Sequence, residues 1–459
     1  MERTIRSENS MVTGVIWKQL LLFFFPIMLG SLFQQLYNTG GWVGGVAKLV
    51  GTDALAAVGG SASNILNLLI GFFTGVSSGA TVIISQYFGA NDRDGVNRAL
   101  HTAMLFALVG GAFIMVLGLV GTEFMLRLMD TPEDTIAGSA LYLRIMFMGM
   151  VPNMVYNVGS AILRAMGDSK RPLYFLIVAC LSNVVLDLVF VLGFKMGIAG
   201  VAIASILAQA ISAVMVVMSL SAESMEYRFR FRQMRFEGDI LSRTIRIGLP
   251  AGFQSIMYSL SNMLIQASVN RFGTDTVASW VVLGKVDGIN WMILGALGIA
   301  SMTFVGQNYG AGRLDRIQKS LKLSLLIGVC ISIVFGGALL LFGWPLFGLF
   351  TSDDTVLAMS MQLLWYFAPF YWLFVPIEII SGALRGMGDT LIPTIITATG
   401  ICVFRVAWIY TVVPLHNSMF TVSLSYPISW VLTAIAFAIY YMIARKKLIA
   451  NAPKPRTAE

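Results

Sequence analysis

Long apolar stretches separated by short charged segments run through the whole chain, and they limit its fold more than any other feature. Hydrophobic residues make up 57% of the 459 residues, charged residues only 12%, and the mean hydropathy is +0.79. So few charged groups cannot cover the apolar surface of a water-soluble domain. Because the stretches are continuous rather than alternating, they predict transmembrane helices and disfavour a membrane β-barrel. We expect twelve helices, near 15–38, 53–79, 99–121, 137–161, 172–194, 198–219, 243–270, 277–301, 320–349, 359–382, 391–414 and 420–443.

The net charge of +8 follows from how the basic residues are distributed between the two sides of the membrane. With the N-terminus in the cytoplasm, most of the 31 Lys and Arg residues fall in cytoplasmic segments and helix ends. This is the asymmetry of the positive-inside rule. It predicts a multi-pass protein of a bacterial plasma membrane with both termini in the cytoplasm, in contact with membrane lipid and without a nucleic-acid partner.

The second half of the chain repeats the first at a nearly constant offset of about 220 residues. GTDALAA from Gly51 recurs as GTDTVAS from Gly273, and LRAMGD from Leu163 recurs as LRGMGD from Leu384. SQYFGAN and GQNYGAG form another such pair, which we expect to be loops. Six helices per repeat give both halves one membrane orientation, so a pseudo-two-fold along the membrane normal should relate two bundles. We expect an N-terminal six-helix bundle over 1–221, a basic cytoplasmic linker over 222–242, and a C-terminal six-helix bundle with a short tail over 243–459.

These motifs, in this order and repeated, resemble the multidrug and toxic compound extrusion (MATE) transporters over roughly residues 15–445. The resemblance implies secondary active efflux of organic, cationic or amphipathic solutes by alternating access. It implies antiport with H⁺ or Na⁺ as coupling ion, no other cofactor, no enzymatic activity and a monomer. A flippase for a lipid-linked precursor is the alternative. Such a flippase would need a strongly basic central cavity, whereas only three basic residues lie in the interior of the expected helices. A channel is a further alternative, which currents above transporter rates would reveal. A membrane enzyme is disfavoured because no H-E-x-x-H or G-x-S-x-G element is present.

Asp187 is the strongest candidate for cation coupling. Asn183 lies four residues before it, so both side chains project from one face of a helix. A carboxylate beside a carboxamide oxygen could bind Na⁺, and the same carboxylate in a desolvated bundle could take a proton instead. The family resemblance implies a hydroxyl from the sixth helix, where Ser205 stands, and a weaker match at Tyr142. A purely structural Asp187 is the alternative.

Five further charged residues fall inside expected helices, where a charge is costly. Three positive and three negative charges, Asp187 included, suggest pairing that fixes helix packing, with a coupling role as the alternative. Lys285 and Asp287 are two residues apart and should not pair directly. The five residues are Arg144, Lys285, Asp287, Glu378 and Arg405.

The first helix departs from the family pattern. Family members usually carry an Asp shortly after the Tyr-Asn-Thr element, but here Thr39 is followed by Gly40, Gly41, Trp42, Val43, Gly44 and Gly45. The glycines predict a frayed or bent helix end. Either this end is simply flexible, or coupling has passed to Asp187 alone or to Glu378, Asp287 and Lys285.

Aromatic and Met side chains on the first, seventh, eighth and tenth helices are candidates for the wall of a substrate cleft between the bundles, together with polar residues such as Asn157 on the fourth helix. Ordinary helix packing is the alternative for each of them. The candidates are Phe33, Gln34, Tyr37, Asn38, Asn157, Gln254, Met257, Tyr258, Trp291 and Met292.

Overall fold

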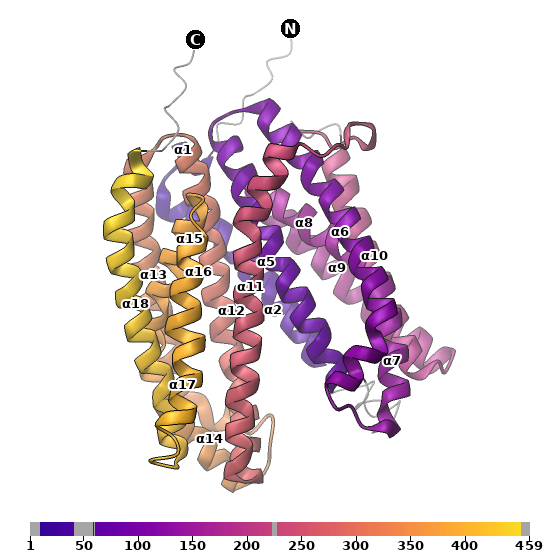
Figure 1. Ribbon diagram of the computed structural model, residues 1–459, viewed down its shortest axis with the longest axis vertical. Coiled ribbons are helices and arrows are strands. Elements are labelled where there is room, and N and C mark those ends of the chain that lie inside the picture. Colours follow the sequence, from indigo (N-terminus) through magenta and orange to yellow (C-terminus); the bar gives the residue numbers. More distant parts are fainter. Residues whose placement is uncertain (1–9, 41–57, 59, 223–226, 451–459) are drawn as a thin grey trace. The chain divides into compact units, whose positions relative to one another are not determined.

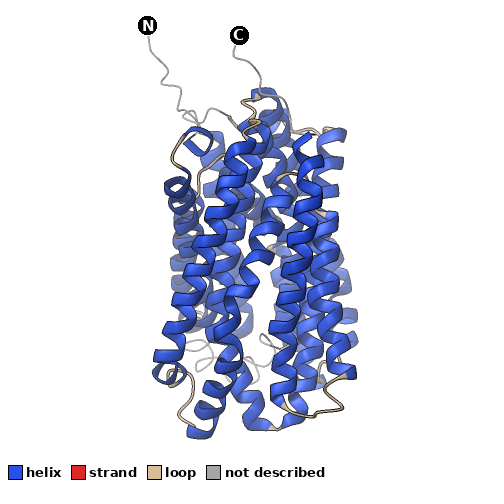
Figure 2. Ribbon diagram, turned by 90° about the vertical axis from the view of Figure 1, so that its left-hand side faces the viewer, coloured by secondary structure: helices blue, strands red, loops and turns tan. Residues whose placement is uncertain are grey.

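The computed structural model describes residues 10–40, 58, 60–222 and 227–450, without the side chains of 36–40 and 449. Within these residues the regular structure is entirely helical (Figure 2). The α-helices are α1 (Ser10–Thr13), α2 (Ile16–Gly40), α5 (Ser61–Gly89), α6 (Arg93–Leu128), α7 (Glu133–Met148), α8 (Met150–Ala165), α9 (Lys170–Asp187), α10 (Gly197–Ser221), α11 (Gly238–Val269), α12 (Thr274–Gly310), α13 (Leu314–Phe347), α14 (Asp354–Phe367), α15 (Val375–Gly386), α16 (Leu391–Thr397), α17 (Phe404–Thr411) and α18 (Met419–Ala450). Short 3₁₀ segments are η3 (Phe231–Gln233), η4 (Asn270–Phe272) and η5 (Ala368–Phe374), and π segments are η2 (Leu188–Gly193) and η6 (Ala398–Val403).

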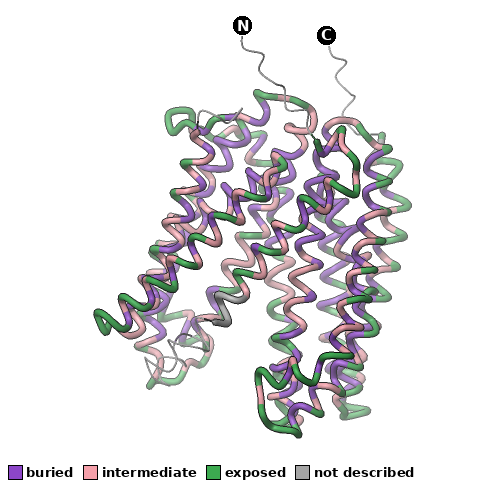
Figure 3. Tube along the Cα trace, turned by 180° about the vertical axis from the view of Figure 1, so that it is seen from behind, coloured by how far each residue is buried: buried purple, intermediate pink, exposed green. Residues whose placement is uncertain are grey.

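Ten of the described helices, some of them made of consecutive segments, are long and apolar enough to cross a membrane. The number is eleven if α7 and α8, which meet at a bend of 49°, form one span. Large apolar side chains such as Val120 and Leu341 are about four-fifths exposed on these helices, and exposed residues follow the helix surfaces in Figure 3. Such surfaces are stable against lipid rather than water. The chain is therefore an all-helical integral membrane protein, as the hydropathy predicts.

The repeated Gln-x-x-Gly-Ala elements are helical, so their prediction as loops is wrong. They form the last turns of α5 and α12, which run about ten residues beyond the predicted ends. Each helix is followed by a residue with positive φ, Asn91 (53°) after α5 and Gly312 (68°) after α12. There the backbone turns back on the last turn, and the N–H of Asp92 donates to the carbonyl of Tyr87 at 3.0 Å. Nothing before this turn breaks the helix, which explains the extra length.

The repeated LRAMGD and LRGMGD motifs end α8 and α15 in the same way. The glycines directly before the aspartate of each motif, Gly167 and Gly388, have φ of 90° and 91°. The N–H of the following aspartate returns to the leucine carbonyl five residues earlier, at 2.9 Å for Asp168 and 3.0 Å for Asp389. Because a Cβ would be strained at this φ, the motif needs glycine there. The repeat thus preserves signals that end helices.

The chain divides into two compact units whose limits fall inside α2 and α11. Unit 1 comprises Met1–Phe24 and Phe253–Glu459, and unit 2 comprises Phe25–Gly252. The first turns of α2 thus belong to unit 1, and the first turns of α11, their counterparts in the repeat, belong to unit 2. The bundle limits expected from the repeat lie at residues 221 and 243, between helices. The limits of the two units instead lie within α2 and α11.

In unit 2, α8 packs against α5, α6 and α10, and α10 packs against α7 and α9 (Figure 1). The start of α11 lies directly on α5, because each helix presents two glycines four residues apart. A Cβ at Gly79 would collide with the carbonyl oxygen of Thr244, and a Cβ at Gly248 with that of Val76. Gly75 and Gly252 oppose each other in the same contact, where a Cβ at Gly75 would lie 2.6 Å from the Gly252 nitrogen. The two backbones therefore touch without intervening side chains.

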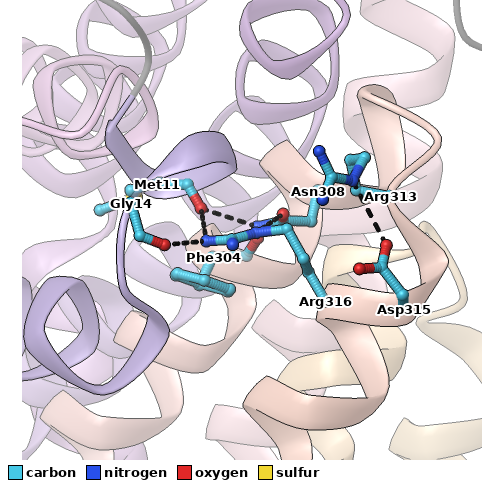
Figure 4. A network of polar contacts seen from close by, with 7 residues as sticks. All are labelled: Met11, Gly14, Phe304, Asn308, Arg313, Asp315 and Arg316. Atoms are coloured by element: carbon cyan, nitrogen blue, oxygen red, sulfur yellow. Dashed lines mark hydrogen bonds and ion pairs between the residues drawn. The ribbon is translucent and has the colours of Figure 1, made fainter.

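In unit 1, α12 packs against α13, α14 and α15, and α18 packs against α14, α15 and α17 (Figure 1). Short α1 joins this unit through Arg316, which is 8% exposed (Figure 4). The Arg316 guanidinium donates to the backbone carbonyls of Met11 (3.0 Å) and Gly14 (2.7 Å) and to the side-chain oxygen of Asn308 (3.0 Å). These acceptors are neutral, so the contact depends on hydrogen bonds rather than on an ion pair.

Replacing Arg316 with Met should detach α1 from unit 1. The substitution leaves the Gly14 carbonyl and the Asn308 amide oxygen without their donor, whereas the Met11 carbonyl keeps the hydrogen bond from the Asn308 amide (3.3 Å). We expect this loss to cost about 2–4 kcal/mol of stability. A lower melting temperature in detergent would show this. Arg313→Met is the matched control, because Arg313 is exposed and pairs with Asp315 at the surface (3.3 Å). That pair should contribute less than about 1 kcal/mol. Equal melting temperatures for the two variants would contradict the role of Arg316.

Candidate functional site

Asn183 and Asp187 form a buried polar pair at the end of α9, directly before the π segment η2. Asn183 is 1% exposed and Asp187 7%. Both polar atoms of the Asn183 amide and one carboxylate oxygen of Asp187 lack a hydrogen-bond partner among the described residues. Buried polar atoms are almost always paired in folded proteins, because leaving them unpaired is costly. An oxygen pair of this kind is suited to a bound cation or proton.

The two other residues expected near this pair lie on adjacent helices. Tyr142 is buried on α7 and Ser205 is half-buried on α10. Since α10 packs against both α7 and α9, all four candidates come from three helices that meet at α10. Tyr142 and Ser205 each have an interaction of their own in the structure. Their role as cation ligands stays a prediction.

Lys285 and Asp287 point to different neighbours, as their spacing predicts. The Asp287 carboxylate accepts a hydrogen bond from the Tyr371 hydroxyl. Lys285 is exposed, with its Nζ 5.5 Å from the centroid of the Phe350 ring. Asp287 is thus held by a neutral donor.

The expectation that the six charges of the helix interiors neutralise one another is wrong. Arg144 contacts Glu123 of α6 at 2.5 Å, with both side chains about half exposed, and is not a buried charge. Glu378 faces Arg385 of its own helix at 3.8 Å. Arg385 follows Glu378 by seven residues, two helical turns, so both lie on one helix face. Arg144 and Glu378 therefore each face a charged residue on the adjacent helix or on the same helix, and not another of the six charges.

Arg405 on α17 is 5% exposed and has no carboxylate within 4 Å among the residues that the structure describes. Its Nε donates to the Ser429 hydroxyl at 2.9 Å. The guanidinium carbon lies 3.9 Å from the centroid of the Tyr426 ring and 5.9 Å from that of Trp430. Neutral and aromatic groups therefore surround this cation.

The candidates for the substrate cleft divide between the two units. In unit 2, Phe33 and Gln34 are exposed, and Asn157 is half-buried with its amide bound to Asn153 of its own helix (2.9 and 3.0 Å). The side chains of Tyr37 and Asn38 lie outside the described residues, as does most of the Gly-rich stretch with its missing acid. In unit 1 the remaining five are all half-buried, namely Gln254, Met257, Tyr258, Trp291 and Met292.

Trp291 belongs to an aromatic cluster in unit 1 that sequence reasoning missed. Its ring centroid lies 4.8 Å from Phe374, 5.6 Å from Trp430 and 6.2 Å from Tyr371. Tyr426 adjoins Trp430 at 6.0 Å. The FYWLF run at 370–374 was the available signal, since four aromatics in five residues within an apolar helix suggest an aromatic surface.

Comparisons with known proteins agree on one family. The MatE family model matches residues 26–189 and 250–411, one match in each repeat. The probable multidrug resistance protein YoeA of Bacillus subtilis (strain 168) is 29% identical over 449 residues, covering 94% of this chain and 95% of that protein. A FAD transporter of Shewanella oneidensis is 26% identical over 318 residues, 67% of this chain and 69% of that protein.

Solved structures give the same fold. An outward-facing multidrug resistance MATE family transporter of the MOP superfamily superposes with a TM-score of 0.90. That match covers 98% of this chain and 100% of the other at 21% identity. Together with the two family matches, which cover more than half of the sequence, this identifies the chain as a member of the MATE family of multidrug efflux transporters.

Proposed function

We propose that the protein is a secondary active exporter in which the inward flow of a cation drives an organic, cationic or amphipathic solute outward. The buried Asn183–Asp187 pair carries this proposal. Its unpartnered oxygens would be satisfied by a coupling ion, and a group that alternately binds and releases an ion can link that ion to a second solute. Tyr142 and Ser205 would complete the site from the neighbouring helices.

A proton is the simpler occupant of this site. Na⁺ requires several oxygen ligands, whereas a proton needs only the carboxylate of Asp187. The first helix lacks an acid after Thr39 that could add a second carboxylate. Neutralising a buried carboxylate by protonation also removes the desolvation cost of its charge.

The proposed architecture has twelve membrane helices in two six-helix bundles, related by a pseudo-two-fold along the membrane normal. Among the described residues, ten helices are long and apolar enough to span a membrane, the bent pair α7 and α8 adds one, and α11 would be the twelfth. Arg243 and Arg246 near the start of α11 lower its apolarity and suit a cytoplasmic helix end. Both termini would lie in the cytoplasm of a bacterial cell, and the protein would act as a monomer in its plasma membrane.

The alternative, a flippase for a lipid-linked precursor, gains no support from the relatives named above, which are a multidrug resistance protein and a FAD transporter. Their names instead favour small organic solutes for this chain. Alternating access of the two bundles around a shared cleft would move these solutes.

Efflux from proteoliposomes tests the proposal. Vesicles loaded with ethidium, a fluorescent organic cation, receive a pH gradient or a sodium gradient in separate experiments. We expect efflux under the pH gradient and not under the sodium gradient alone. Efflux under sodium alone would replace the proton with Na⁺. If ethidium leaks out equally slowly under both gradients and from protein-free vesicles, coupled export is contradicted.

A further inference from the structure

Arg405 is a buried cation in unit 1 without a neutralising acid nearby. The Asp287 carboxylate is held by the Tyr371 hydroxyl and lies beyond 4 Å from Arg405. A guanidinium has five N–H donors, and only Nε is assigned a partner in the described structure, the hydroxyl of Ser429. The charge and most of the donors of Arg405 are therefore left for another group.

A second donor beside Arg405 is also unused. Trp430 is fully buried, and its indole N–H lacks a hydrogen-bond partner among the described residues. The Trp430 ring lies 5.9 Å from the Arg405 guanidinium carbon. Indole N–H groups normally find an acceptor when they are buried. This indole N–H and the N–H groups of Arg405 other than Nε, which have no acceptor assigned among the described residues, are together complementary to an anion.

The repeat places this cation on the counterpart of the helix that carries Asp187. The offset of about 220 residues sets α9 and η2 against α16, η6 and α17. Asp187 directly precedes a π segment, and Arg405 follows the other π segment by two residues. Such segments are frequent at functional sites. Equivalent helices thus carry an unpaired acid in unit 2 and an unpaired base in unit 1.

The surroundings of Arg405 suit an aromatic molecule. Tyr426 and Trp430 lie against the guanidinium, and Trp291 packs on Trp430 at 5.6 Å. Arginine binds carboxylate and phosphate groups with paired hydrogen bonds, and the strength of such bonds rises where water is excluded. A purely structural Arg405 would gain its stacking on Tyr426 but would leave its own charge and the Trp430 N–H unsatisfied.

We propose that Arg405 and the Trp430 indole N–H form an anion-binding site for aromatic solutes that carry a carboxylate or phosphate group. This inference rests on the proposed export function, because it names part of the chemistry of the exported solute. It narrows the amphipathic class to molecules with an anionic end, which a site built only for organic cations would reject.

Binding of two flavins in nanodiscs of phosphatidylcholine tests the site. Flavin mononucleotide (FMN) carries a phosphate and riboflavin lacks it, so their ratio isolates the anion. Flavin fluorescence measures both dissociation constants. We expect the Kd of FMN to be about tenfold or more lower than the Kd of riboflavin. Arg405→Gln should abolish this preference. Lys322→Gln removes an exposed positive charge from α13 and should leave the preference intact.

Equal Kd values for the two flavins in the wild-type protein, or an unchanged FMN preference in Arg405→Gln, would overturn the proposal. Loss of the preference in nanodiscs that contain phosphatidylglycerol would assign the site to a lipid headgroup and overturn a solute site. If the Gln variant does not fold, Arg405→Lys replaces it. The lysine ammonium is a point charge without the planar guanidinium, so it should reduce the preference for FMN without removing it. An undiminished preference for FMN in Arg405→Lys would overturn the proposal.

Ethidium efflux by the same protein in proteoliposomes separates this inference from the proposed function. Wild type that exports ethidium but shows no FMN preference would refute the anion site alone. Wild type that prefers FMN but exports neither flavin nor ethidium would refute coupled export alone.

Discussion

Asp187→Asn should abolish gradient-driven ethidium efflux while the protein still folds and inserts. The substitution keeps the size of the side chain and removes the group that would take up and release the coupling proton. We expect the coupled rate to fall to the level of protein-free vesicles. The melting temperature should not fall, because a buried carboxylate without a partner is costly in the folded protein and the amide is not charged.

Asp134→Asn provides the matched control. Asp134 is exposed in the first turn of α7, in the same repeat, so it loses the same charge outside the buried pair. Its efflux should equal that of the wild type. If Asp187→Asn retains coupled efflux, Asp187 is not the coupling residue. If Asp134→Asn loses it equally, the effect comes from net charge and not from the site.

Gly79→Ala should destabilise unit 2 by about 1–3 kcal/mol, because the added methyl group meets a backbone oxygen and not a movable side chain. The new Cβ would collide with the Thr244 carbonyl, so α5 and α11 must separate. Gly248→Ala should act similarly from the other helix, where the Val76 carbonyl stands in the way. Thermal unfolding in detergent measures both losses, and Leu at either position should cost more than Ala.

Gly295→Ala distinguishes a packing effect from a general effect of replacing helix glycines. Apart from the backbone of its own helix turn and its chain neighbours, no heavy atom of the described residues lies within 4 Å of a Cβ built at Gly295 on α12. Alanine there should be neutral or stabilising by up to about 1 kcal/mol, since it has the higher helix propensity. The two substitutions should thus differ in sign. A gain in stability for Gly79→Ala would show that α5 and α11 are not in backbone contact.

Much of the candidate site could be predicted from the sequence because it depends on spacing along one helix. The separation of four residues puts Asn183 and Asp187 on one face, and the structure buries both. The separation of two residues sends Lys285 and Asp287 to different neighbours. Partners on other helices could not be predicted in this way. Glu123 for Arg144 and Tyr371 for Asp287 lie 21 and 84 residues away in the chain.

By itself the sequence determined that this chain is an all-helical membrane protein built from two repeats, since apolar length, charge asymmetry and repeated motifs are local properties of the chain. The sequence also contains the glycines that end helices. It did not predict at which residue each of those helices ends, because the hydrogen bonds that close a helix end form only when the turn has folded. Only the tertiary structure decided which charges have partners. It left Arg405 among aromatic rings and exchanged the first turns of α2 and α11 between the units, because such contacts depend on which helix faces come together in space.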